Sequence, residues 1–360
     1  MEKQVVTLAV RIIRQSSREN PADAALRENT RKSELSPERL RLVVQAVFDY
    51  FRWLPWLDPS IGIGQQLDEM ETLQARGVSD AELRQLTLPN WVSSVMPVEV
   101  VWLRSLQQQP RLWLRVRRGF KEKLMETLGD CVPASDDYPA ALEYLGRKDL
   151  FRESCFQEGW FEIQDISSQA IGHVCNPQAG ETWWDACAGE GGKTLHLADL
   201  MENKGLIWAS DPAAWRLERL KRRTARAQVF NYRRELWDGG AKLPTKTKFD
   251  GILVDAPCSG VGTWQRNPHA RWTSSPEEVA RLAELQINIL RHAVKGLKPN
   301  GRLVYSVCTL TTPETEGVVA AVNESCPELQ LQTQKLLWPY DAGGNGMFYA
   351  VWIRRSIGGA

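Results

Sequence analysis

The sequence predicts an α/β protein in which a mostly parallel sheet carries helices on both faces. From about residue 166 onward, strand-like and helix-like stretches alternate, which is the pattern of βαβ units. FDGILVDAP (249–257) has the apolar content of a buried parallel strand. A glycine-rich turn, DACAGEGGKT (185–194), joins another strand to a helix. These three observations favour an open, doubly covered sheet in the second half of the chain.

The first segment, 1–85, is predicted to be helical. In SPERLRLVVQAVFDYFRWLPW (36–56), Ser36 is a suitable N-cap and Pro37 suits the first turn. Apolar residues recur there at helical spacing: Leu40, Val43, Val44, Val47, Phe51 and Leu54. We expect these aromatic and aliphatic side chains to form a core rather than a ligand site.

The second segment, 86–165, changes to short alternating elements and is predicted to be a small α+β module. RLWLRVRR (111–118) alternates with a period of two, so that Trp113, Arg115 and Arg117 face away from the apolar side. The stretches that follow are expected to be helical, extended, helical and extended in turn: 120–129, 140–146, 150–159 and 160–165.

The third segment, 166–360, is predicted to hold the large sheet. Its expected strands are 181–185, 206–211, 229–236, 249–257 and 301–309, followed by a helix from about 313 and an extended pair that ends near 355. The helix over 275–297 begins with a capping box formed by Ser275 and Glu278 around Pro276.

Composition excludes several classes of protein. Hydrophobic residues make up 43% and charged residues 25% of the chain, as in ordinary globular proteins. The net charge of +1 means that any RNA-binding charge must be gathered locally. Seven cysteines without a CxxC pair and four scattered histidines argue against a disulfide framework and against a metal site. No membrane-spanning run or secretory signal is expected, so we predict a cytoplasmic protein and a monomer.

Chemically distinctive residues follow the strands of the predicted sheet. Ligands of open α/β sheets bind beyond the carboxyl ends of the strands. Reading those ends in order gives acidic groups and two thiols on one rim: Asp185, Asp211, Asp238, Asp255, Cys258 and Cys308.

The glycine-rich turn indicates the kind of cofactor. Gly189, Gly191 and Gly192 let backbone approach a ligand closely, but the turn is neither GxGxxG nor a Walker A loop. Glu190 would repel a phosphate. A cationic or zwitterionic ligand such as S-adenosylmethionine therefore fits better than NAD.

Two carboxylates could hold the adenosine part of such a cofactor. Asp211 lies about twenty residues beyond the glycines, where a carboxylate can bind ribose hydroxyls. Asp238, in LWDGG, could accept from an adenine amino group, although a plain turn aspartate is an equal interpretation.

The two strand-end cysteines indicate covalent chemistry. Cys258 and Cys308 each sit just past an apolar strand, unlike Cys131, Cys155, Cys175, Cys187 and Cys326, which are expected to be structural. Methylating cytosine C5 requires a nucleophile at C6, which a thiolate can supply, and a base that later removes the C5 proton. Asp255 could bind the cytosine N3/N4 edge. Spacing alone leaves either thiol as the nucleophile.

These motifs resemble the Sun/Fmu (NOL/NOP/Sun) family of RNA cytosine-C5 methyltransferases. The resemblance covers about 86–355 and rests on five stretches: EGWFEIQDISSQ (158–169), DACAGEGGKT (185–194), ASDPAAWRLERL (209–220), FDGILVDAPCSGVGTWQRNPHARW (249–272) and YSVCTL (305–310). It implies a Rossmann-like class I methyltransferase domain with a mixed sheet, and S-adenosylmethionine as cofactor. The helical segment 1–85 resembles a shortened NusB-like domain only loosely.

The resemblance also assigns roles. It implies that Cys308 is the nucleophile, that Cys258 assists product release, and that Lys193 and Asp255 lie near the target base and the methyl donor. The cofactor would contact Cys187, Ala188, Gly189, Glu190, Gly191, Gly192, Lys193, Asp211, Arg216, Asp238 and Asp255. One departure is Gly189-Glu190, where the family usually has Ala-Pro, and it could alter cofactor affinity or RNA entry.

RNA is the expected partner, and rRNA is favoured over tRNA. Trp113, Arg115 and Arg117 are predicted to contact phosphates and stack a base. Arg266, Asn267, His269 and Arg271 could line the channel for a flipped target nucleotide. The basic cluster Arg219, Lys221, Arg222, Arg223 and Arg226 is as readily a solvated helix face. Three alternatives stay open: a tRNA cytosine-C5 methyltransferase, an NAD-dependent oxidoreductase, and a non-catalytic RNA-binding assembly factor.

Overall fold

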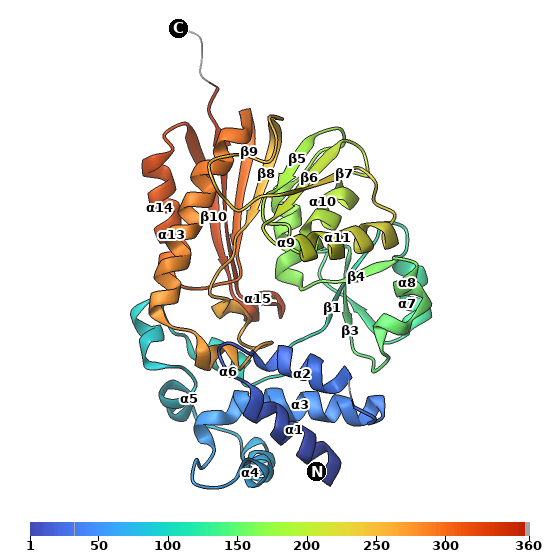
Figure 1. Cartoon of the computed structure of the whole chain (residues 1–360), viewed down its shortest axis with the longest axis vertical. Helices are drawn as coiled ribbons and strands as arrows, with labels where there is room; N and C mark the ends of the chain where they lie inside the picture. Colours follow the sequence, from blue (N-terminus) through green and yellow to red (C-terminus); the bar gives the residue numbers. More distant parts are fainter. Residues whose placement is uncertain (32, 357–360) are drawn as a thin grey trace. The chain divides into compact units, whose positions relative to one another are not determined.

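A computed structural model describes residues 1–31 and 33–356 (Figure 1). The chain forms two compact units. The first comprises Met1–Pro110 together with Gly260–Glu278, and the second comprises Arg111–Ser259 and the chain from Val279 onward. In the part of the chain that the structure describes, none of the helices is both long and apolar enough to cross a membrane.

The first unit is helical. Its helices are α1 (Lys3–Gln15), α2 (Ala22–Arg31), α3 (Pro37–Trp53), α4 (Ile63–Arg76), α5 (Asp80–Leu86), α6 (Val100–Leu106) and the short α12 (Ala270–Thr273). The predicted helix over 36–54 is confirmed as α3, and the Ser36 side chain accepts a hydrogen bond from the Arg39 N–H at 3.4 Å. Residues of α1, α3 and α4 form its core, among them Ile12, Val47 and Leu67. Between Leu86 and Leu106 the structure has a short 3-10 helix, Asn90–Ser94, and α6, joined by loops, where the sequence predicts short alternating elements.

A four-stranded antiparallel sheet begins the second unit. Its strands are β1 (Trp113–Val116), β2 (Cys131–Pro133), β3 (Ala141–Tyr144) and β4 (Phe161–Ile163), in the order β2-β3-β1-β4, with helices α7 (Lys121–Leu128) and α8 (Ser154–Gln157). This sheet matches the predicted α+β module, except that β2 is absent from the prediction. The predicted domain boundaries at 85 and 165 stay a prediction.

A seven-stranded mixed sheet forms the rest of the second unit. Its strands are β5 (Thr182–Asp185), β6 (Leu206–Asp211), β7 (Tyr232–Leu236), β8 (Phe249–Asp255), β9 (Leu297–Val307), β10 (Leu329–Leu337) and β11 (Met347–Arg354), in the order β10-β11-β9-β8-β5-β6-β7. The strands from β9 to β7 in this order are parallel, whereas β11 runs antiparallel to β9 and to β10. After β5, the chain adds β6 and β7 on one side of it and then β8 and β9 on the other side. The topological switch point therefore lies between β5 and β8.

Helices cover both faces of the large sheet, as predicted. These are α9 (Ile166–Cys175), α10 (Gly192–Leu200), α11 (Ala214–Arg226), α13 (Pro276–Ala293) and α14 (Glu316–Ser325), and the short α15 (Pro339–Ala342) precedes β11 (Figure 1). Side chains of α13 and α14 pack with Trp184, Ile252 and Tyr305 on one face. Side chains of α9 and α10 pack with Trp183 and Leu253 on the other. Consecutive strand residues therefore point into opposite cores, which confirms the α/β fold class.

Candidate active site

The carboxyl ends of the parallel strands bring the predicted rim residues to one edge of the sheet. Asp185 ends β5, Asp211 ends β6 and Asp255 ends β8, while Cys308 directly follows β9. The register pairs Asp185 with Leu253 and Asp255 with Ser306, so β5, β8 and β9 end nearly level. This edge is where ligands of such sheets bind.

The glycine-rich turn between β5 and α10 uses two left-handed glycines. Gly189 has φ +54° and Gly191 has φ +87°, values that side-chain-bearing residues rarely adopt. A Cβ at Gly191 would lie 2.7 Å from the Leu220 side chain, so α10 and α11 can pack closely only with glycine there. A Cβ at Gly189 would meet no atom of the described residues within 4 Å. The turn is thus open at Gly189 and tightly packed at Gly191.

Asp211 is buried and braces this turn from the end of β6. Its Oδ2 accepts a hydrogen bond from the Gly189 N–H at 3.1 Å, and its Oδ1 accepts from the Ala213 N–H at 2.8 Å. Arg216 Nη1 lies 3.6 Å from Asp211 Oδ2. Asp238 is exposed, and its Oδ1 accepts from the Gly240 N–H at 2.9 Å, which is the turn geometry that the sequence left as an equal interpretation.

Asp185 lies beneath the turn in a fully buried position. The Thr194 hydroxyl donates to its Oδ2 at 2.6 Å, whereas its Oδ1 has no hydrogen-bond partner among the described residues. Burial raises the pKa of Asp185 to about 7. A buried acceptor without a donor is costly and favours a site that receives a ligand or a water.

Lys193, on the first turn of α10, forms a partly buried ion pair with Asp255. Its Nζ lies 2.6 Å from Asp255 Oδ2, and the Ser306 hydroxyl donates to Asp255 Oδ1 at 2.7 Å. Burial lowers the Lys193 pKa, but the Asp255 carboxylate outweighs it and the net pKa is raised. The lysine is therefore held as a cation beside the ends of β8 and β9.

The two strand-end thiols are in contact. Cys258 Sγ lies 3.2 Å from Cys308 Sγ. The hydrogen bond from Cys258 lowers the pKa of Cys308 against the opposing effect of burial, and the Lys193 cation adds to the lowering. A thiolate at Cys308 with a neighbouring thiol as donor is an activated nucleophile.

The remaining cysteines differ from this pair. Cys131, Cys155, Cys175 and Cys326 are buried, and burial raises the pKa of each thiol. Burial also raises the pKa of Cys187, in the glycine-rich turn. Their thiols are protonated at neutral pH, in keeping with structural roles.

Glu190, where this chain departs from the family pattern, is paired. Its carboxylate Oε1 lies 2.6 Å from Arg219 Nη1 of α11, and its backbone carbonyl accepts from the Arg223 guanidinium at 3.1 Å. Arg219 also lies over the exposed Trp215 ring at 4.9 Å. The acidic substitution in the turn thus comes with a cation on the neighbouring helix.

The expected exposed face on β1 is wrong for Trp113 and Arg115. Both are nearly fully buried, and Ile166 of α9 and Ala342 of α15 pack with Trp113. Trp113 Nε1 donates to the Gly343 carbonyl at 2.8 Å. Arg115 donates to Gln164 at 2.7 Å and pairs with Asp199 at 3.2 Å. Arg117 is partly exposed, and its RNA contact stays a prediction.

Two of the residues expected to line a nucleotide channel are also buried. His269 is 3% exposed, and its Nδ1 lies 3.5 Å from the Ala22 N–H. Arg271 is fully buried and donates to the carbonyls of Thr87 and Leu106 at 3.1 and 3.3 Å. Both side chains belong to the core of the helical unit, so the channel role is wrong for them. Arg266 is partly exposed, and its role stays a prediction.

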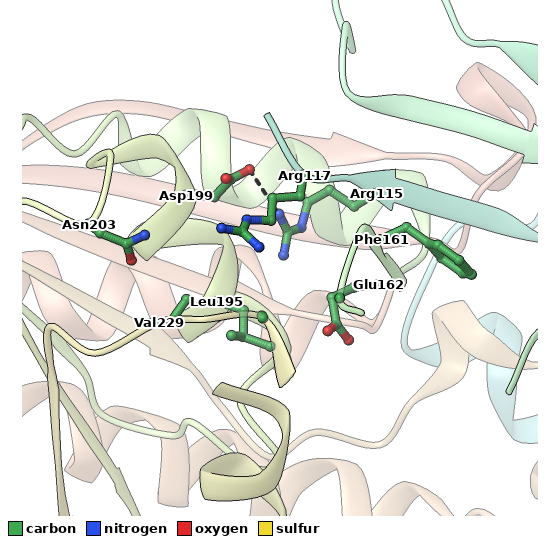
Figure 2. A pocket seen from close by; sticks show the side chains of 10 residues that line it. Arg115, Arg117, Phe161, Glu162, Leu195, Asp199, Asn203 and Val229 are labelled. Atoms are coloured by element: carbon green, nitrogen blue, oxygen red, sulfur yellow. Dashed lines mark hydrogen bonds and ion pairs between the residues drawn. The ribbon is translucent and has the colours of Figure 1, made fainter. Parts of the chain in front are cut away.

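A small pocket lies elsewhere in the second unit (Figure 2). Arg115, Arg117, Glu162 and Asp199 line it together with apolar residues. Its charges are compensated internally: Arg115 pairs with Asp199, and Glu162 pairs with Arg223 at 2.8 Å and with Arg226. Arg223 and Arg226 therefore belong to an internal network rather than to a free basic face. The pocket contains none of the predicted catalytic residues.

Glu314 is a residue that the sequence reasoning missed. It is fully buried beside Ser259 and Thr309, each of which follows one of the paired cysteines. An acidic residue inside the threonine-rich run TLTTPET (309–315) is the signal that could have identified it, because closely spaced hydroxyls can satisfy a buried carboxylate.

The curated relatives of this chain are named as ribosomal RNA methyltransferases. A probable ribosomal RNA small subunit methyltransferase B from Synechocystis sp. is 32% identical over 269 residues, which covers 68% of this chain and 59% of that protein. A probable ribosomal RNA small subunit methyltransferase B from Bacillus subtilis is 38% identical over 177 residues, covering 49% of this chain and 40% of that protein. The chain thus spans less than two thirds of the length of these relatives.

Solved structures show the same fold. A crystal structure of PH0851 superposes with a TM-score of 0.81 at 24% identity and covers 98% of this chain and 99% of that one. NSun6 from Pyrococcus horikoshii, solved with SFG, gives a TM-score of 0.64 at 21% identity over 70% of this chain and 93% of that one.

Residues 173–352 match the family described as 16S rRNA methyltransferase RsmB/F. This match covers half of the chain and contains β5 to β9, the glycine-rich turn and both strand-end thiols. It confirms the predicted Sun/Fmu resemblance and the predicted cofactor, S-adenosylmethionine. The chain belongs to the RsmB/F family of rRNA methyltransferases.

Proposed function

We propose that this protein transfers a methyl group from S-adenosylmethionine to C5 of a cytosine in RNA, and that this RNA is ribosomal. The observation that carries the proposal is the 3.2 Å contact between Cys258 Sγ and Cys308 Sγ beside the Lys193–Asp255 ion pair. Membership of an rRNA methyltransferase family supports it, as do the names of the curated relatives.

The cofactor fits the residues at the end of β5. The open space at Gly189 admits a ligand against the turn, and the unpartnered Asp185 Oδ1 is an acceptor suited to a cationic group. When bound, the cofactor supplies an electrophilic methyl group. We propose that its adenosine part is held by Asp211, Arg216 and Asp238. Residues 187–193 are proposed to contact the rest of the cofactor.

Cys308 is proposed to be the nucleophile. Its thiolate would form a bond to cytosine C6, and the C5–C6 π electrons would form the bond from C5 to the methyl group while the bond between that methyl group and the sulfonium sulfur breaks, its electron pair going to the sulfur. A base then removes the C5 proton, the C5–H electron pair re-forms the double bond, and the C6–S bond breaks to regenerate the Cys308 thiolate. Cys258, in contact with the leaving sulfur, is placed to assist this last step.

Lys193 and Asp255 are proposed to act on the nucleophile and on the target cytosine, respectively. Lys193 stabilises the negative charge on Cys308, and Asp255 presents a carboxylate that is fixed by Lys193 and Ser306. A fixed carboxylate can accept from the cytosine amino group. We propose that RNA also contacts exposed residues of α11, namely Trp215, Lys221 and Arg222.

The roles of the two thiols can be tested by substituting each one. Cys308→Ala should abolish methyl transfer, because no bond to C6 can form, while cofactor binding measured by calorimetry is retained. Cys258→Ala should instead accumulate a covalent protein–RNA adduct, seen as a slowly migrating band on a denaturing gel. An active Cys308→Ala protein would refute the proposal.

A second experiment identifies the class of RNA that is methylated. Tritium release from C5-labelled rRNA and tRNA, measured side by side with the unaltered protein, separates an rRNA enzyme from a tRNA enzyme. Cys326→Ala is a suitable control, because Cys326 is a buried thiol that is not among the proposed site residues. Release from tRNA alone would move the assignment to tRNA.

A further inference from the structure

Glu314 is an ionisable residue buried next to the two contacting thiols. It ends the short 3-10 turn Thr312–Glu314, which follows β9, and its side chain is fully buried. Acidic residues are almost never fully buried unless they are paired or hydrogen-bonded. No lysine or arginine side chain forms an ion pair with it among the described residues, so hydrogen bonds must satisfy the carboxylate.

Both carboxylate oxygens accept several hydrogen bonds. Oε1 accepts from the Ser259 N–H at 2.8 Å and from Gln286 Nε2 at 3.0 Å. Oε2 accepts from three hydroxyls: Ser259 Oγ at 2.5 Å, Thr311 Oγ1 at 2.8 Å and Thr309 Oγ1 at 3.2 Å. One carboxylate thus fixes groups from the loop after β8 and from the loop after β9.

These contacts fall directly beside the two thiols. Ser259 follows Cys258, and Thr309 follows Cys308. Ser259 Oγ and Thr309 Oγ1 also lie 2.9 Å apart. On the other side of Cys258, the Pro257 carbonyl accepts from Gln286 Nε2 at 2.9 Å, so Cys258 is held from both of its neighbours.

The rest of the network anchors Glu314 to the sheet. The Tyr305 hydroxyl of β9 lies 2.8 Å from Gln286 Oε1 and 2.6 Å from the Glu314 carbonyl. Gln286 comes from α13, and both Gln286 and Tyr305 are fully buried. The carboxylate is therefore attached to a rigid strand and a rigid helix, while the groups that it holds belong to two loops.

We propose that Glu314 is a positioning residue that keeps the Cys258 and Cys308 sulfurs in contact by binding the residue after each of them. This inference rests on the proposed function for its catalytic consequence, but the geometric claim stands without it. Glu314 binds the residue that follows each cysteine, Ser259 and Thr309. Its effect passes through Ser259 and Thr309.

Three variants test the proposal. Glu314→Ala removes both acceptor oxygens and leaves the donors of both loops unsatisfied. Glu314→Gln keeps the size and one acceptor oxygen for the Ser259 N–H and Gln286, and its NH2 group can donate to two of the three hydroxyls, which also accept. Glu316→Ala is the matched control, because Glu316 lies two residues away on α14 and is exposed.

The first readout reports the distance between the thiols without RNA. Diamide oxidises two neighbouring thiols to a disulfide, and its N=N bond takes up the two electrons and two protons. A disulfide requires the sulfurs to approach to about 2.05 Å, so its rate of formation depends on how closely the loops hold them. Peptide mapping by mass spectrometry measures the Cys258–Cys308 bond.

The expected result separates the variants. Glu314→Ala should form the Cys258–Cys308 disulfide at least about tenfold more slowly than the unaltered protein, and Glu314→Gln should stay within about threefold of it, since proximity alone controls such rates by orders of magnitude. Glu316→Ala should not differ from the unaltered protein. Melting temperature and cofactor binding confirm that each variant is folded.

The second readout is methyl transfer. We expect Glu314→Ala to lower kcat by about a hundredfold with little change in KM, because a misplacement of 1 Å can cost that much, and Glu314→Gln to rescue most of the rate. An unchanged disulfide rate in folded Glu314→Ala would overturn the proposal. If the disulfide rate falls as expected while no variant, nor the unaltered protein, methylates cytosine, the positioning role stands and the proposed function fails.

Discussion

At the scale of single residues, the site combines two groups whose charge states are set by neighbouring side chains with one whose charge state is set by burial. Lys193 is kept cationic by Asp255, and the Cys308 thiol is acidified by Cys258. Asp185 is the opposite case, because burial favours its neutral form. The proposed reaction can use both kinds of group, a fixed cation beside the proposed nucleophile and an acceptor that ionises near neutral pH.

The pKa of Asp185 gives a prediction about stability and pH. Its unfolded pKa is near 3.9, and its folded pKa is about 7, so the folded state binds the proton more tightly. This contribution to stability is fully present below pH ~4 and is lost as pH rises through ~7. The Asp185→Asn side chain cannot ionise. Between pH 5 and 8 the free energy of unfolding of this variant should therefore rise relative to that of the unaltered protein by about 3 kcal/mol.

Urea unfolding of both proteins at several pH values measures this difference. Asp136→Asn serves as the control, because Asp136 is exposed in the same unit of the chain. Its difference from the unaltered protein should not depend on pH in this way. A constant difference for Asp185→Asn across the range would show that Asp185 is ionised throughout.

At the scale of elements, sequence pattern predicts strands and helices well where local chemistry decides them. β5, β6, β8 and β9 are apolar runs between turn residues, and each ends where the sequence places an acidic residue or a cysteine. The contact between Cys258 and Cys308 follows from two adjacent parallel strands. Which side of a strand is exposed does not follow locally, and β1 shows why: its alternation is real, but residues of α9 and α15 pack with Trp113 on its polar side.

The buried position of Arg115 gives a prediction that differs from an RNA-binding role. Arg115→Ala should lower the free energy of unfolding by about 3 kcal/mol, because Asp199 loses its buried partner and Gln164 loses a donor. At a temperature where the variant is folded, its affinity for RNA in a filter-binding assay should be unchanged.

Arg117→Ala is the matched substitution on the same strand end. Arg117 is partly exposed and bonds to the exposed Gln228 at 3.2 Å, so stability should change by less than about 1 kcal/mol. If Arg115→Ala were stable but bound RNA weakly, the original RNA-binding interpretation of β1 would be restored.

At the scale of the whole molecule, the chain passes between its two units close to the active-site loops. Ser259 belongs to the second unit, and the residues that follow it, Gly260–Glu278, belong to the helical unit. The sequence could not predict this, because the partners of that segment lie more than a hundred positions away. His269 and Arg271 look like channel residues when read beside Cys258, yet they bond to residues of the first unit such as Thr87.

Because residues 260–278 belong to the helical unit, we expect a substitution in the core of that unit to change their amide protection as well. Trp264 is fully buried with its ring 6.3 Å from that of Trp102 and 6.1 Å from that of Trp91. Trp102→Ala should cost about 3–5 kcal/mol, as large-to-small core changes do, and should lower amide protection in 260–278 together with that in α3 and α6. Protection in β5, β8 and β9 should stay as it is, because those strands have their own core. Hydrogen exchange followed by mass spectrometry on the full chain measures all of these segments at once, with exposed Val101→Ala as the control. Unchanged exchange in 260–278 alongside faster exchange in α3 would mean that the segment after the Cys258 loop folds independently of the helices that contact it.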